Sequence, residues 1–103
     1  MTAFSSDPVD PLVSPQRAAE LDDNRAMILD LARATGDPAL MTHVHAVRYC
    51  EELLFVHEAL AEIRAKKGQQ ESAQDEQTLC EMARQLGLHH LDVLDLHLFQ
   101  NKP

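Results

Sequence analysis

One stretch of this chain, from Asp37 to Gly68, limits the possible folds more than any other part of the sequence. Asp37 can accept hydrogen bonds from the first free backbone N–H groups of a helix, and Pro38 suits the first turn, where no donor is needed. Three cations precede the closing glycine and suit the negative end of a helix dipole: Arg64, Lys66 and Lys67. The stretch therefore predicts a helix of about 30 residues, roughly 45 Å long.

Apolar residues in this stretch recur at alternating steps of three and four, which is the spacing of one helix face. The row consists of Ala46, Tyr49, Leu53, Val56, Leu60 and Ile63. Val47, Leu54 and Ala61 widen the apolar face to roughly 200° of the circumference at 100° per residue. One neighbouring helix cannot cover that width, so a homodimer is expected. The residues expected to mediate self-association are Tyr49, Leu53, Val56, Leu60 and Ile63.

The other expected elements are also helical. Ser14 and Pro15 begin a first amphipathic helix that Gly36 ends, and its short connection to the long helix favours antiparallel neighbours or a sharp corner. The polar run at 69–77 contains the best loop candidate, and Ser72 with Asp75 fits a capping-box-like start for a third helix that ends at Gly87. A short fourth helix is expected behind it. The sequence thus predicts an all-α fold: an antiparallel helical hairpin and a short C-terminal corner, doubled into a dimeric helical bundle.

The chain length of 103 residues allows one domain with one modest core. Two prolines in the N-terminal segment bias the residues before them away from helix. We expect three parts: a disordered tail at 1–13, a single all-helical domain at 14–100 and a frayed end at 101–103.

Charge and apolar patterning disfavour several classes of partner. Nine Lys and Arg residues against seventeen Asp and Glu residues give a formal charge of −8, which opposes binding to nucleic acids and anionic lipids. The sequence shows neither a secretory signal nor the roughly 18 apolar residues of a membrane span, so a cytoplasmic location is expected. Cys50 and Cys80 are expected to be reduced, buried thiols, with a disulfide between the second and third helices as the alternative.

The stretch from Met82 to Val93 resembles the helix-turn-helix pattern of DNA-binding regulators. In that resemblance Ala83 lies where two helices cross and Gly87 lies in the turn, which implies a transcription regulator that uses residues 79–100. The expected recognition helix carries Asp92 and Asp95 but no Lys or Arg before Lys102. Because phosphate neutralisation supplies much of the affinity for DNA, a corner without a DNA role is the favoured interpretation.

A row of His43, Cys50 and His57 recurs every seven residues along the long helix, with Arg64 next. Neighbours in this row lie about 10.5 Å apart along the axis, too far to share one metal ion. We expect these residues to flank the seam between helices and to set its register. Metal or haem binding through His43, His57, His90 or His97 remains a less favoured hypothesis, and no cofactor is expected.

No catalytic constellation is visible, and an enzyme is not expected, because the three glycines all mark helix ends and Cys50 lies two turns from His57. The favoured hypothesis is a small acidic interaction module: a regulator, adaptor or inhibitor that binds another protein through a helical face. An aromatic residue on a charged face is a plausible anchor for such a partner. The candidate contact residues are Phe55, Val44, Glu51, Glu58 and Glu62.

Overall fold

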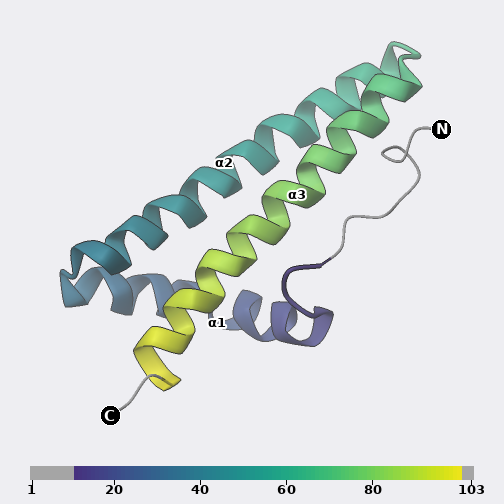
Figure 1. The fold of residues 1–103 in the computed structure, drawn as a ribbon. Coiled ribbons are helices and arrows are strands. Elements are labelled where there is room, and N and C mark those ends of the chain that lie inside the picture. Colours follow the sequence, from purple (N-terminus) through teal and green to yellow (C-terminus); the bar gives the residue numbers. More distant parts are fainter. Residues whose placement is uncertain (1–10, 101–103) are drawn as a thin grey trace.

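The computed structural model describes residues 11–100, which form three long helices and a terminal π-helical turn (Figure 1). Helix α1 spans Pro15–Thr35, α2 spans Pro38–Lys66 and α3 spans Gln70–Asp95, followed by the turn Leu96–Gln100. The predicted all-α fold is confirmed over this part of the chain. None of its helices carries an apolar stretch of the length that a bilayer crossing requires.

The predicted boundary between the first two helices is confirmed in detail. The backbone N–H of Arg17 donates to Ser14 Oγ at 3.2 Å, and the backbone N–H of Ala39 donates to Asp37 Oδ1 at 2.9 Å. Gly36 ends α1 with a φ of 69°, a left-handed conformation that costs glycine little. Local capping signals were therefore sufficient to place these two helix starts.

The third helix was expected to begin at Ser72, after a loop within the polar run at 69–77. α3 begins instead at Gln70, and Gly68, with a φ of 78°, makes the turn. Most residues of the run are Gln, Glu or Ala, which favour helix. Ala73 and Glu76 then pack toward α2, so the run continues as helix up to the turn.

The predicted C-terminal corner is also absent, because α3 passes through Gly87 without a break. Gly87 lies where the two helices approach closely: a Cβ atom placed on it would be 3.3 Å from Cys50 Cβ. The glycine therefore serves close helix packing and not a turn. Residues 79–95 form one straight helix, and the helix-turn-helix hypothesis loses its geometric basis.

Helices α2 and α3 lie side by side and run in opposite directions (Figure 1). His43 contacts His90 near one end, and His57 contacts Glu76 near the other. We call the pair the α2–α3 hairpin. Its proximal half consists of residues 38–51 and 84–95, and its distal half of residues 52–66 and 70–83. From the sequence, α2 was expected to form the hairpin with α1 instead.

Helix α1 packs across the proximal half and completes its core. Arg25 binds Glu51 of α2, Arg84 of α3 binds Asp22, and Arg17 binds Asp92 at 2.8 Å. Beneath these ion pairs lies the main hydrophobic core of the described residues, whose largest fully buried side chains are Leu21, Ile28, Val44, Val47 and Leu94. The distal half extends beyond these contacts (Figure 1).

Part of the predicted N-terminal tail is ordered against the helices. The backbone N–H groups of Leu12 and Val13 donate to Gln85 Oε1 at 3.0 and 3.4 Å, and Val13 is buried in the core. The prediction of disorder was therefore wrong for residues 11–13, because a buried glutamine on α3 satisfies their backbone donors. Residues 1–10 and 101–103 lie outside the described residues.

Candidate interaction surface

The seam of the α2–α3 hairpin is the line along which the two helices contact each other. The residues next to the seam distinguish the two sides of the hairpin. On α2, Glu51 follows the seam residue Cys50 and meets α1; on α3, Leu88 follows Gly87 and enters the core beside α1. Because successive residues turn by 100°, residues that precede the seam positions face the opposite side. Leu53 and Leu60 on α2, like Leu79 and Leu86 on α3, precede seam positions and therefore lie on the side away from α1.

That side carries a row of apolar residues from each helix, and we call the two rows together the hairpin face. Its residues are Tyr49, Leu53, Val56, Leu60 and Ile63 on α2, and Leu79, Met82, Leu86 and Val93 on α3. Six of them are exposed, from 41% for Leu79 to 62% for Tyr49, and the other three are half-buried. Two acidic residues border the rows: Asp75, which precedes the seam residue Glu76 on α3, and Glu52, which lines a shallow pocket with Val56.

The α2 row of this face is the set predicted for self-association. In the single chain these five residues do not form the core, which uses a different row of α2: Leu40, Val44 and Val47. The α3 row was recognised in part as the apolar side of a third helix. Its alignment with the α2 row depends on the helix continuing through Gly87, which the sequence did not indicate.

The distal half of the hairpin has few large apolar residues in its interior, and its seam residue Leu54 is only half-buried. Its buried residues are Ala61, Ala73 and Ala83. The small side chains let the two helices approach closely, and the large apolar residues of this half, such as Val56 and Met82, point outward. This is the reverse of the packing expected for a hairpin that is stable alone.

Polar side chains complete the distal seam. His57 Nδ1 lies 2.6 Å from Glu76 Oε2, and Arg64 Nε lies 3.8 Å from Glu76 Oε1. The Arg64 Nε atom is itself buried without a hydrogen-bond partner. Such pairs contribute more to register than to stability, so the distal half gains little folding energy from its own interior.

The predicted partner-binding residues do not share one surface. Val44 is only 1% exposed, so its assignment to a partner surface was wrong: α1 covers the side of α2 that had been taken as solvent-facing. Glu51 is engaged by Arg25 in a two-bond ion pair. Phe55 is 74% exposed, and Glu58 and Glu62 line an open groove on the α1 side of the distal half.

Histidines gather at the proximal end of the seam. His43 Nδ1 and His90 Nδ1 are 3.0 Å apart, with one ring donating and the other accepting, and the His89 ring lies 5.5 Å from that of His90. Burial lowers the pKa of His90, and the positive charges of His43 and His89 would lower it further. Among residues 11–100, no three His, Cys, Asp or Glu side chains converge in a way that fits a metal ion.

Cys50 and Cys80 are free cysteines in this structure. Cys50 is buried, whereas Cys80 is partly exposed. Burial raises the pKa of both thiols, and nearby carboxylates raise it further: Glu51 for Cys50, Glu58 and Glu76 for Cys80. The thiols therefore stay protonated at neutral pH and act as small packing residues.

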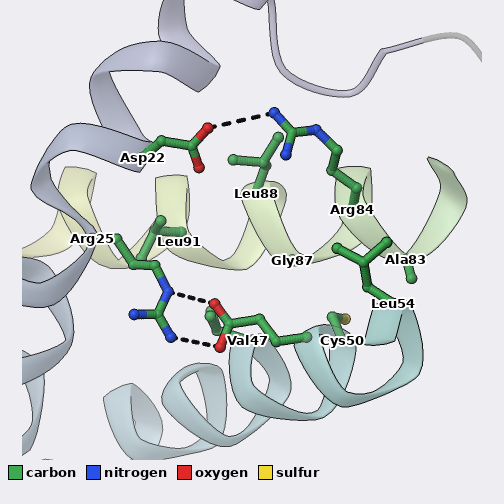
Figure 2. A pocket seen from close by; sticks show the side chains of 11 residues that line it. Asp22, Arg25, Val47, Cys50, Leu54, Ala83, Arg84, Gly87, Leu88 and Leu91 are labelled. Carbon is green, nitrogen blue, oxygen red and sulfur yellow. Dashed lines mark hydrogen bonds and ion pairs between the residues drawn. The ribbon is translucent and has the colours of Figure 1, made fainter. Parts of the chain in front are cut away.

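A small cavity of about 80 Å³ lies where α1 crosses the hairpin. Figure 2 shows it framed by the Arg25–Glu51 and Arg84–Asp22 ion pairs, with Leu88 and Leu91 of α3 between them. Its volume is far below the 300–1,000 Å³ typical of sites for drug-sized ligands. We assign the cavity to imperfect packing at the three-helix crossing.

The hairpin face is thus the largest feature of the described residues that their own packing leaves unexplained. Comparisons with known proteins add no assignment: no family model matches the chain, and the searches of curated proteins and of solved structures found no match either.

Proposed function

We propose that this chain is a small acidic interaction module, a regulator, adaptor or inhibitor in the cytoplasm, with no catalytic activity of its own. It acts by binding polypeptide through a helical face. The observation that carries this proposal is the hairpin face, with six large apolar side chains between 41% and 62% exposed along two adjacent helices. Contiguous apolar patches of this kind mark interaction sites.

The chemistry of the face favours polypeptide over nucleic acid or lipid headgroups. Phosphate groups are bound by Lys and Arg side chains, and the hairpin face contains neither. Two parallel rows at steps of three and four form ridges and a groove, into which the ridges of another helix can pack. A helical polypeptide is therefore the class of partner that fits.

A second surface supports binding to another protein while the hairpin face is occupied. Glu58, Glu62 and Glu81 line the distal groove on the α1 side. Phe55 lies next to this acidic surface on the outer side of α2, where it lines a shallow pocket with Glu51, Glu52 and Val56. This surface suits a partner with basic side chains around an apolar residue. We keep Phe55, Glu58 and Glu62 as the residues proposed for that contact.

Site-specific photo-crosslinking in the native cells tests the proposed function. A photoreactive amino acid is placed at Val56 or Met82 on the hairpin face and, as the matched control, at Gln74, which is exposed on α3 outside the face. We expect crosslinks to a polypeptide from both face positions and none from Gln74. Absence of any polypeptide crosslink from Val56 and Met82 would contradict the proposal.

A further inference from the structure

Building on the proposed function, we propose that the occupant of the hairpin face is a second copy of this chain. Two hairpins pack about a two-fold axis with their faces together and form a four-helix bundle. Helix α1 of each copy stays on the outside, because its ion pairs with Glu51 and Arg84 are on the opposite side of the hairpin. Forming the dimer therefore displaces no contact seen within the single chain.

The size of the face matches what a stable dimer requires. At their exposed fractions, from 41% to 62% for the six exposed members, the nine side chains present roughly 700 Å² per copy for residues of this size. Stable protein interfaces bury about 800 Å² per partner. The hairpin face alone reaches this range, without any contribution from the termini.

The charge pattern favours a copy of the same chain. A two-fold interface places one surface patch against the same patch of the second copy, so a charge within it would face a like charge. The chain carries a formal charge of −8, yet the nine side chains of the hairpin face are uncharged, and the acidic residue in line with the α3 row, Asp75, lies beyond its distal end at Leu79. The acidic residues Glu58, Glu62 and Glu81 lie on the far side, where the two copies do not repel each other at close range.

The dimer also supplies the interior that the distal half lacks. Within one chain, α2 and α3 are separated there by alanines, and this thin layer buries little apolar area. With a second hairpin in place, Val56, Leu60 and Met82 would form a second layer of large residues between the two pairs of helices. Alternation of small and large layers is how four-helix bundles fill their cores.

Sedimentation equilibrium of the full chain tests the proposal directly. From micromolar to millimolar concentration we expect a mass of twice 11.5 kDa, the mass of one chain. A mass of 11.5 kDa over the whole range would overturn the assignment of a second copy to the face. This measurement uses the unaltered protein, so its outcome does not depend on whether a variant folds.

Two substitutions locate the interface. Val56→Glu places a carboxylate in the hairpin face, whereas Gln74→Glu places the same group at an exposed position of α3 outside the face. We expect Val56→Glu to weaken the dimer by at least about a hundredfold, and Gln74→Glu to leave it unchanged. Circular dichroism serves to confirm that both variants stay helical. A helical Val56→Glu variant that dimerises normally would overturn the proposed interface, and so would dissociation by Gln74→Glu alone.

The photo-crosslinking experiment separates failure of this inference from failure of the proposed function. A monomeric mass together with Val56 crosslinks to a different polypeptide removes the second copy and leaves the proposed function standing. A monomeric mass with no polypeptide crosslink removes both. Crosslinked products of twice the chain mass support both.

Discussion

The proximal and distal halves of the α2–α3 hairpin are built from the same two helices but are stabilised in different ways. In the proximal half, Val44 and Val47 of α2 and Leu94 of α3 are buried beneath α1, so the core is complete within the chain. In the distal half, α1 makes no ion pair, and the buried residues are the alanines Ala61, Ala73 and Ala83. The contrast supports the proposal that another molecule completes the far end of the hairpin.

The largest predicted effect belongs to the proximal core. Ile28 is fully buried, and Ile28→Ala removes buried methyl groups and leaves a cavity, so we expect a loss of about 3 kcal/mol in the free energy of unfolding. Ile63→Ala, at a distal side chain that is 48% exposed in the single chain, should cost well under half as much when both substitutions are made in the monomeric Val56→Glu variant. Urea denaturation monitored by circular dichroism measures both. Equal losses in that monomer would remove the distinction between the two halves.

Close packing of the two helices predicts the next effect, at Gly87. A Cβ atom there would lie 3.3 Å from Cys50 Cβ, so Gly87→Leu should cost about 1–3 kcal/mol by forcing the helices apart. Gly87→Ala combines a tight contact with a better helix propensity, and its net change should stay within about 1 kcal/mol. Thermal unfolding compares the two. Tolerance of leucine without loss would mean that α2 and α3 are not closely packed here.

The ion pairs of Arg17 predict a smaller effect, confined to the attachment of α1. Arg17 donates to Asp92 and Asp95, which lie on α3 and lose their cationic partner in Arg17→Met. We expect a loss of about 1–2 kcal/mol, since these are charge-assisted hydrogen bonds at a side chain that is 25% exposed. Arg33→Met is the control, because Arg33 pairs only with the exposed Asp30 of its own helix. Equal effects of the two substitutions would contradict the role given to Arg17.

The smallest predicted effect is a pH dependence at the proximal end of the seam. The pKa of His90 is lowered in the folded chain from its ordinary value of 6.5. The unfolded chain therefore binds this proton more readily, and stability falls as the pH drops below about 6.5 toward the folded-state pKa. Unfolding curves at a series of pH values should be flatter for His90→Gln than for the wild type or for the exposed-site control His45→Gln. A pH dependence that His90→Gln leaves unchanged would assign the effect to other groups.

The sequence was sufficient wherever local chemistry decides the structure. Ser14, Gly36 and Asp37 fix their helix ends through their own side chains or backbone, so α1 and the start of α2 were predicted correctly. Gly87 was taken for a turn, because the sequence does not distinguish a glycine needed for close helix packing from a glycine that ends a helix. Only the position of Cys50 opposite it distinguishes the two cases.

Only the α2 row of the hairpin face was predicted from the sequence, for a related reason. The spacing of Tyr49, Val56 and Ile63 along α2 shows a second apolar row in the sequence itself, and the excess apolar width indicated that one chain does not cover it. The matching row of α3 can be assigned to the same side only when the register between α2 and α3 is known. Val44 was misplaced because nothing in the sequence states which side of α2 is covered by α1.

The burial of Tyr49 offers the most direct test of the claim that another polypeptide covers the hairpin face. The chain has one tyrosine and no tryptophan, so its ultraviolet-excited emission reports on this position alone. Tyr49 is 62% exposed in the single chain, and we predict that acrylamide quenches its emission weakly from micromolar concentration upward, where the second copy covers it, and strongly in the helical Val56→Glu variant, where the dimer is dissociated. Quenching that stays at the level of an exposed tyrosine at every concentration would contradict the account.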